Sequence, residues 1–384
     1  MTKEKVIPQI RFSGFTDTWE QRKLSAIADK VTEKNVGLQY IETFTNSAEF
    51  GIISQRDFFD HDIAKMSSLG GYYIVRSEDF VYNPRISTSA PVGPINRNKL
   101  GRIGVMSPLY TVFRPHDIDT TYLEYFFKSK YWHSFMNFNG DSGARSDRFS
   151  IKDSVFFEMP IPIPHIDEQK KIGAFLDKLD SLITLHQRKY DKLTKVKKAM
   201  LEKMFPENGS PYPEIRFKGF TDAWEQRKLG DTVQITMGQS PDGSTYSDVP
   251  SDYILVQGNA DLQNGWVSPR VWTSQMTKKA DAGDLIMSVR APAGAMGKTA
   301  YNAVIGRGVA AIKGNEFIYQ LLEKMDSDGY WKALSCGSTF ESLNSDNIKN
   351  ADVLIPDVAE QEKIGEYFLA IDRLITLHQR KPFC

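Results

Sequence analysis

Two stretches of the chain are basic and contain no acidic residue, at positions 80–116 and 285–315. An arginine can contact O6 and N7 of guanine through two parallel hydrogen bonds, and either arginine or lysine can hold a phosphate. Arg85 and Arg290 are 205 positions apart, which is also the distance between two near-identical segments of the chain, 10–24 and 215–229. This pattern favours contact with DNA, and the candidate residues are Arg85, Arg97, Lys99, Arg102, Arg290, Lys298, Arg307 and Lys313.

A polar loop of small residues follows each basic stretch. Residues 140–146 include Arg145 and residues 335–339 include Ser338, and both side chains join the candidates for DNA contact. Small residues let a backbone approach a groove closely. For one basic stretch alone, a plain surface loop with neutralised charges is an equally good interpretation. The duplication at matched positions favours DNA contact.

Three patterns that would indicate catalysis are incomplete. Residues 293–299 resemble a phosphate-binding loop, but Pro292 occupies the position of its first glycine. Asn83-Pro84-Arg85 resembles the signature of amino-methyltransferases, yet the second proline and the aromatic residue are missing. The six histidines are scattered, and no nucleophile, base and oxyanion donor assemble. The sequence predicts no catalytic residue, no metal site and no cofactor bound by this chain.

The elements that must position these loops are duplicated. Fifteen residues at 10–24 recur at 215–229 with two differences, Ser13 against Lys218 and Thr18 against Ala223. We call these segments the opening repeats. Eight residues at 182–189 recur at 374–381. The bodies between these repeats, 25–157 and 230–353, are not alike. We therefore expect two copies of one scaffold with two different readers, and a target with two different halves.

Each body is followed by a helical pattern with an apolar seam. Residues 166–204 predict one helix, because prolines 160, 162 and 164 precede it and Asp167 and Glu168 suit its first turn. Apolar residues recur in steps of four and three, which is typical of a coiled coil. The seam residues are Ile172, Leu176, Leu179, Ile183 and His186 in the first helix, and Ile364, Phe368, Ile371, Ile375 and His378 in the second.

The two seams predict that the helices pair with each other. If a two-fold axis relates the copies, the helices run antiparallel, and His186 and His378 occupy equivalent positions that set the register. For one seam alone, a helix packed on its own domain is the simpler interpretation.

The bodies combine short apolar strands with one helix each, so the fold class is α/β or α+β. Predicted strands lie at 72–75, 80–82, 102–105, 110–113, 253–257, 285–289 and 308–312, and predicted helices at 120–138 and 316–334, the latter with a possible break at Gly329. The predicted segments are 1–165 (opening repeat and first body), 166–205 (first long helix), 206–357 (second body) and 358–384 (second helix and tail).

Composition is that of an ordinary globular protein, with 41% hydrophobic and 25% charged residues. The formal net charge of zero lowers the expectation of DNA binding without excluding local basic patches. Two distant cysteines, Cys336 and Cys384, point to a reducing compartment, which we expect to be the cytoplasm. The first residues lack the apolar core of a signal peptide. The sequence contains no apolar run of about 18 residues, so we expect no membrane span.

The opening repeats, the Ile-Pro-Ile-Pro at 161–164 and the helix starts Glu-Gln-Lys-Lys-Ile at 168–172 and Glu-Gln-Glu-Lys-Ile at 360–364 resemble the specificity subunits of type I restriction-modification systems. The resemblance covers essentially the whole chain. It implies two target-recognition domains, each reading one half of a split sequence in double-stranded DNA. It also implies an antiparallel coiled coil of two long helices that fixes the spacing.

The resemblance further implies partners and an absence of catalysis in this chain. Methylation subunits, two of them in a symmetric complex, would use S-adenosylmethionine, and restriction subunits would use ATP and Mg²⁺. One departure is the short second helix, which lacks counterparts of the basic residues 192–203. Two alternatives stay open, a free-standing nuclease or methyltransferase with an unrecognised site, and a structural adaptor that binds no DNA.

Overall fold

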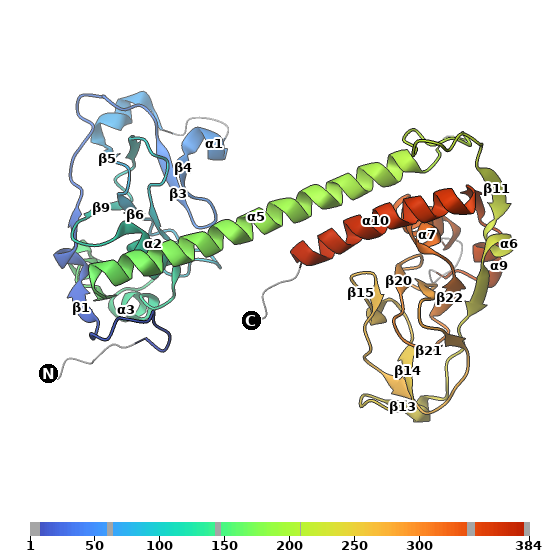
Figure 1. Cartoon of the computed structure of the whole chain (residues 1–384). Coiled ribbons are helices and arrows are strands. Elements are labelled where there is room, and N and C mark those ends of the chain that lie inside the picture. Colours follow the sequence, from blue (N-terminus) through green and yellow to red (C-terminus); the bar gives the residue numbers. More distant parts are fainter. Residues whose placement is uncertain (1–7, 60–63, 143–146, 208, 336–341, 380–384) are drawn as a thin grey trace. The chain divides into compact units, whose positions relative to one another are not determined.

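The computed structural model describes residues 8–59, 64–142, 147–207, 209–335 and 342–379 (Figure 1). The chain divides into two compact units, Met1–Ile183 and Thr184–Cys384, which we call unit 1 and unit 2. The boundary falls inside one helix, α5 (Ile166–Met204), whose bounds match the predicted helix. The sequence placed this helix in a segment of its own, whereas its first half belongs to unit 1 and its second half to unit 2.

The centre of unit 1 is a four-stranded antiparallel sheet. Its strands are, in spatial order, β2 (Ala28–Lys30), β9 (Thr111–Pro115), β6 (Phe80–Tyr82) and β7 (Ile95–Arg97). Phe80 and Phe113 on this sheet stack with their ring centres 5.5 Å apart, and Phe127 of the neighbouring helix packs against both rings. Burial of these large aromatic side chains holds the helix on the sheet.

Two short strand pairs and several helices complete unit 1. The pairs are β3 (Phe44–Ser47) with β4 (Gly51–Ser54), and β5 (Tyr73–Val75) with β8 (Gly104–Met106). The helices are α1 (Gln55–Phe59), α2 (Thr120–Lys128), α3 (His133–Asn139) and α4 (Asp153–Phe156).

Unit 2 contains the same sheet order inside a larger structure. Its six-stranded sheet is β12 (Gln234–Met237), β22 (Val309–Lys313), β19 (Leu285–Ser288), β20 (Met296–Lys298), β16 (Trp266–Val267) and β15 (Leu262–Gln263). The first four strands are antiparallel and correspond in order to β2, β9, β6 and β7 of unit 1. The two bodies therefore share this sheet, although their sequences are not alike.

Unit 2 also has a second sheet, and two of its strands match the antiparallel pair β5 with β8 of unit 1 in their order along the chain. The second sheet consists of β13 (Tyr246–Ser247), β17 (Trp272–Thr273), β14 (Tyr253–Val256), β21 (Ala303–Ile305) and β18 (Lys279–Ala280). The helices of unit 2, besides the second half of α5, are α6 (Leu229–Thr232), α7 (Glu316–Ser327), α8 (Tyr330–Ser335), α9 (Ser345–Lys349) and α10 (Val358–Gln379).

Each unit is closed by its first and last strands, which pair with each other. In unit 1, β1 (Glu20–Lys23) pairs antiparallel with β10 (Pro160–Ile163). In unit 2, β11 (Glu225–Lys228) pairs with β23 (Asp352–Ile355), and Glu225 faces Ile355 as Glu20 faces Ile163. We call each of these pairs a clasp. The two ends of each body are therefore held side by side in the same register.

Two predicted helices in the bodies have different outcomes. The single helix predicted at 120–138 is wrong, because Ser129 is extended (φ −76°, ψ 168°) and separates α2 from α3. Burial of Trp132, whose indole N–H donates to the Phe127 carbonyl at 2.9 Å, stabilises the interruption. The break at Gly329 is confirmed, since its φ of +77° suits glycine and α7 ends just before it.

Helix α10 runs antiparallel to the second half of α5 in unit 2. His186 contacts His378, and Lys197 contacts Asp372. Phe205, the residue after α5, contacts Phe368. The residue number therefore rises along α5 as it falls along α10. Ile364, Phe368 and Ile371 of the predicted seam are buried, and Ile375 is half-buried. The predicted antiparallel pairing is confirmed within this unit.

The first half of the α5 seam lies in unit 1. Ile172 is half-buried and packs against the unit 1 core, and Leu176 is half-buried as well. Leu179 and Ile183 are exposed, at 39% and 61% of their surface.

Within the described residues, no helix is both long enough and apolar enough to cross a membrane.

The equivalent histidines of the two helices contact each other directly. The Nδ1 atoms of His186 and His378 are 2.8 Å apart, so one ring donates a hydrogen bond and the other accepts it. A ring that accepts must be neutral. The predicted role of this pair in setting the register is consistent with this contact.

We expect acidification to weaken the packing of α10 on α5. Partial burial, His186 and Lys189 lower the pKa of His378 below its ordinary value of 6.5. The unfolded state therefore binds a proton more readily than the folded state, and the free energy of unfolding decreases as the pH falls through about 6.5. The thermal midpoint of unit 2 in the full chain should drop more between pH 7.5 and 5.5 than in a His378→Gln variant. An equal drop in both proteins would contradict this role.

Candidate nucleic-acid interface

An ion pair in each unit holds the opening repeat on the first turn of the helix that follows the body. In unit 1, the Arg11 guanidinium donates two hydrogen bonds to Glu168, both of 2.7 Å. In unit 2, Arg216 binds Glu360 in the same way, with two bonds of 2.8 Å. Both glutamates are fully buried. The sequence repeat thus corresponds to the same bidentate contact in both units.

The next residue of each helix connects the scaffold to the body. Gln169 donates to the Pro164 carbonyl at 2.9 Å, and its side-chain oxygen accepts from the backbone N–H of Asp119, the residue that caps α2. Gln361 donates to the Pro356 carbonyl at 3.0 Å and accepts from Asn315, which caps α7. In each unit, therefore, one glutamine side chain at the start of the long helix positions the helix of the body, α2 in unit 1 and α7 in unit 2.

The loop after β6 presents Arg85 at the surface of unit 1. Its backbone pairs with residues 147–149, where Phe149 N–H donates to the Pro84 carbonyl at 2.7 Å and the Asp147 carbonyl accepts from Ile86 N–H at 3.0 Å. The Arg85 side chain is 70% exposed, and Asp147 lies 3.8 Å away. The basic loop therefore pairs with the residues that directly follow the predicted polar loop at 140–146.

The loop after β19 repeats this arrangement in unit 2. Arg290 forms a backbone bridge with Ser342, and Leu343 N–H donates to the Val289 carbonyl at 2.9 Å. Val289 N–H also donates to the Gly308 carbonyl, which places Arg307 beside the same loop. Arg290 and Arg307 are exposed, and neither side chain has an ion-pair partner among the residues that the structure describes.

Arg97 and Lys298, two of the predicted DNA contacts, are held inside their units instead. Arg97 on β7 is buried, with its Nη2 atom 2.6 Å from Glu124 of α2. Lys298 on β20 lies 2.7 Å from Glu316 of α7, and its side chain is 12% exposed. Both cations fasten a helix to the matched strand of the shared sheet. The prediction of DNA contact is not supported for these two residues, because their charges are neutralised within the fold.

Three further candidates are half-exposed but paired with carboxylates of their own unit. Lys99 lies 3.5 Å from Glu124, Arg102 makes two 2.8 Å bonds to Glu42, and Lys313 lies 2.7 Å from Asp281. Hydrogen bonds from Lys313 and Lys279 lower the pKa of Asp281 to about 2. Arg145 and Ser338 lie outside the described residues.

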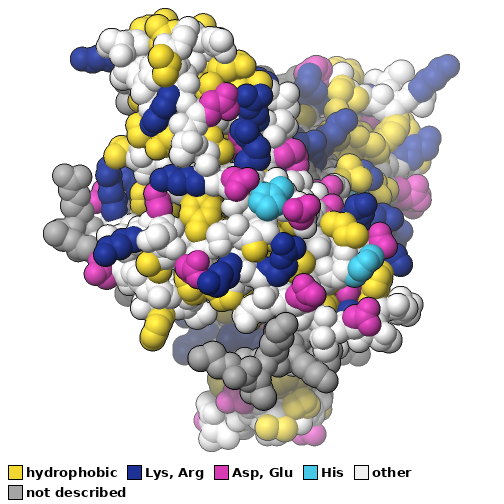
Figure 2. Space-filling model, turned by 90° about the vertical axis from the view of Figure 1, so that its left-hand side faces the viewer, with side chains coloured by type: hydrophobic (Ala, Val, Ile, Leu, Met, Phe, Trp, Pro, Cys, Tyr) yellow, Lys and Arg dark blue, Asp and Glu magenta, His cyan; other side chains and the backbone are white. Residues whose placement is uncertain are grey.

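The structure adds one basic residue that the sequence reasoning missed. Arg148 is half-buried, and its backbone bridges to Arg85. A second arginine close to Arg145, directly after the polar loop, was the available signal. Figure 2 shows basic and acidic side chains interspersed over the face that it draws. On this face, the basic side chains form no broad continuous patch.

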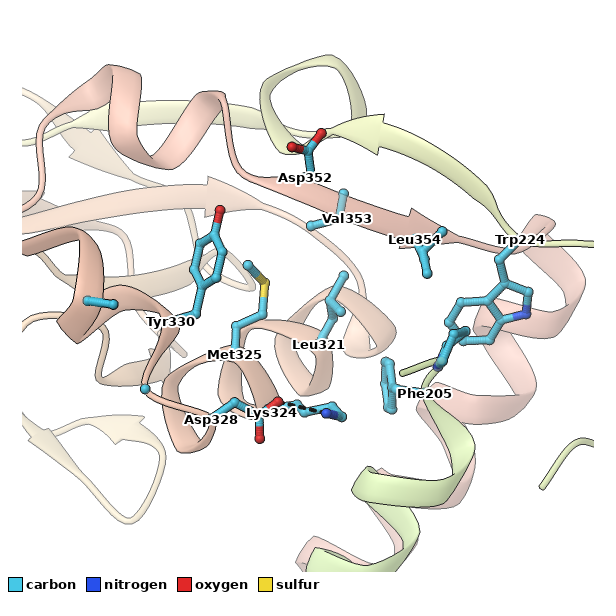
Figure 3. A pocket seen from close by; sticks show the side chains of 13 residues that line it. Phe205, Trp224, Leu321, Lys324, Met325, Asp328, Tyr330, Asp352, Val353 and Leu354 are labelled. Carbon is cyan, nitrogen blue, oxygen red and sulfur yellow. Dashed lines mark hydrogen bonds and ion pairs between the residues drawn. The ribbon is translucent and has the colours of Figure 1, made fainter. Parts of the chain in front are cut away.

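A cavity of about 380 Å³ in unit 2 offers no evident chemistry (Figure 3). It is lined by apolar side chains such as Phe205, Trp224 and Leu354, together with Lys324 and Asp328. Burial alone would lower the pKa of Lys324, but its hydrogen bonds to Asp328 and Glu207 raise it overall. The ammonium group therefore stays charged and is already paired with two carboxylates. Within the described ranges, no three His, Cys, Asp or Glu side chains are grouped as metal ligands.

Comparisons with known proteins agree with this two-unit arrangement. The model of the type I restriction modification DNA specificity domain matches residues 17–195 and 221–382. A putative type I restriction enzyme MjaX specificity subunit of Methanocaldococcus jannaschii is 25% identical, over 99% of this chain and 92% of that protein. The MjaVIII specificity subunit of the same organism is 23% identical, over 73% of this chain and 71% of its own length.

Two solved structures share the fold. A type I restriction-modification S subunit from M. genitalium superposes with a TM-score of 0.62, at 12% identity, and covers 97% of this chain and 94% of that one. A chain from a study of complex assembly and conformational transition of the type I R-M system has a TM-score of 0.50, at 19% identity, with 94% and 92% covered.

Proposed function

The chain belongs to the type I restriction modification DNA specificity family, and on this premise we propose that it recognises a bipartite sequence in double-stranded DNA, with one half read by each unit. The observation that carries this proposal is the repeated scaffold around two different bodies. In both bodies, an exposed arginine (Arg85 or Arg290) follows the matched strand of the shared sheet and forms a backbone bridge to a later residue of its unit, Arg148 or Ser342. Matched loops on unlike bodies suit two different half-sites.

The long helix α5 supports the spacing part of the proposal. It has 39 residues and belongs to both units, and at ~1.5 Å per residue it spans close to 60 Å. Half-sites read from one face of a duplex lie about one helical turn apart, or about 10 base pairs. A continuous helix that belongs to both units would keep the separation of the half-sites constant.

We also propose that this chain contributes recognition and that partner subunits contribute the chemistry. Methylation subunits would bring S-adenosylmethionine, and restriction subunits would bring ATP and Mg²⁺. The relatives are named as specificity subunits, and the candidate interface presents side chains suited to binding bases and phosphates rather than to catalysis.

Adenine methylation mapping tests this function. A plasmid is exposed to the chain, to its cognate methylation subunit, or to both. We expect methylation at one split motif only when both proteins are present. Methylation by the chain alone would make it an enzyme. No methylation by the folded pair would remove the proposed role in recognition.

A further inference from the structure

A cavity of about 340 Å³ opens beside the Arg85 loop in unit 1. It lies between the β3–β4 turn, helix α1 and residues 83–89, and Asn46, Asn83, Arg85 and Phe58 are among its lining residues. From its walls and rim we infer that this cavity is a base-reading site, which takes the edge of a guanine–cytosine pair and the base beside it. This inference rests on the proposed function and assigns a specific role to a site within it.

The floor of the cavity is a rigid network of asparagine amides. Asn46 is buried and donates to the Val81 carbonyl at 2.7 Å, while its side-chain oxygen accepts from Asn96 at 2.7 Å. Asn83 donates to the Asn46 carbonyl at 2.8 Å, and its side-chain oxygen accepts from the Arg85 backbone at 3.0 Å. Because these amides already have partners, the loop that presents Arg85 is positioned before any ligand binds.

Three aromatic rings lie together at the site, and two of them, Phe58 and Phe59, line the cavity. The Phe50 and Phe58 rings contact each other with their centres 6.2 Å apart, and Phe58 and Phe59 lie 4.6 Å apart. Phe50 is 60% exposed and Phe58 40% exposed. Single exposed apolar residues are common, but rings that contact each other beside a cavity mark a binding surface. A base face or a thymine methyl group is an apolar partner of matching size.

The rim carries the carboxylate of Glu49, which accepts hydrogen bonds, and the guanidinium of Arg85, which donates them. Glu49 lines the cavity and is exposed, and its carboxylate has no partner among the described residues. A free carboxylate accepts from the amino group N4 of cytosine, and an arginine donates to O6 and N7 of guanine. Glu49 and Arg85 together therefore match a guanine–cytosine pair. The hydroxyls of Ser87 and Ser89, 3.1 Å apart, complete the polar rim.

The test uses the full chain in complex with its methylation subunit and compares Glu49→Gln with a Phe50→Ala/Phe58→Ala double variant. Tyr131→Ala is the matched control, because Tyr131 is also a half-exposed ring of unit 1 that packs edge-on against one neighbour. We expect Glu49→Gln to relax one guanine–cytosine position in one half of the motif by at least about ten-fold. The double variant should weaken DNA binding by about ten-fold or more, with the thermal midpoint unchanged.

The possible outcomes separate this inference from the proposed function. If the wild-type complex methylates a split motif and both variants behave like Tyr131→Ala, the base-reading site is wrong and the proposed function stands. If the double variant loses the methylation subunit in a pull-down, the aromatic rings bind protein and the inference is overturned. If the wild-type complex has no motif, the proposed function itself fails.

Discussion

Exchange of residues 25–157 for the body of another specificity subunit should change one half of the methylated motif and leave the other half intact. The exchanged segment begins just after β1 and ends just before β10, so both of its ends lie at the clasp of unit 1. Each wrong base pair costs about 1–3 kcal/mol, roughly additively. The original half-site should therefore be lost completely rather than weakened. Methylation mapping of the chimera with the cognate methylation subunit measures the outcome.

The reciprocal exchange is the control for this experiment. Replacement of residues 230–351, which lie between the two strands of the clasp of unit 2, should change the other half of the motif only. The gap between the half-sites should stay the same in both chimeras, because α5 is untouched. A change in both halves after a single exchange would contradict the assignment of one unit to one half.

A large loss of stability is expected from Arg216→Met. Arg216 makes two 2.8 Å bonds to the buried carboxylate of Glu360 and a third bond, of 2.7 Å, to the Asp222 carbonyl. Methionine retains the apolar stem but leaves Glu360 charged, buried and without its cation. Breaking a buried ion pair in this way costs about 3 kcal/mol or more. Denaturant unfolding of the full chain should show the loss in the transition of unit 2.

Arg227→Met, in the same opening repeat, is the matched control. Arg227 pairs with Glu225, but the two side chains are 52% and 68% exposed. Exposed pairs of this kind contribute at most about 1 kcal/mol, so this variant should unfold almost as the wild type does. Equal losses in the two variants would mean that the Arg216–Glu360 pair does not hold the opening repeat on α10.

The long helix and the scaffold could be predicted from the sequence because their signals are local or repeated. The prolines before residue 166 and the apolar residues in steps of four and three predicted both ends of α5 correctly. The matched positions of His186 and His378 anticipated their contact. In these cases, a short window of sequence or a comparison of two windows contained the physical cause.

The candidate site was harder to predict because the partners of a charge are not local. Arg97 and Lys298 stood in stretches without acids, yet Glu124 and Glu316 reach them from helices that begin after those stretches. The second sheet of unit 2 was only partly anticipated, because strands of two residues such as β13 and β17 are too short to show a period. Glu49 gave no signal, since its position in the same cavity as Arg85 depends on the packing of the β3–β4 turn.

The clasps have a consequence for inheritance. The opening repeat ends at the first strand of each clasp, and it is nearly identical in the two halves of the chain. A genetic crossover within this repeat therefore joins two coding sequences at a strand whose pairing does not depend on the body that follows. The recombinant would inherit a whole body in the correct register, so a new specificity could arise in one event without a series of destabilised intermediates.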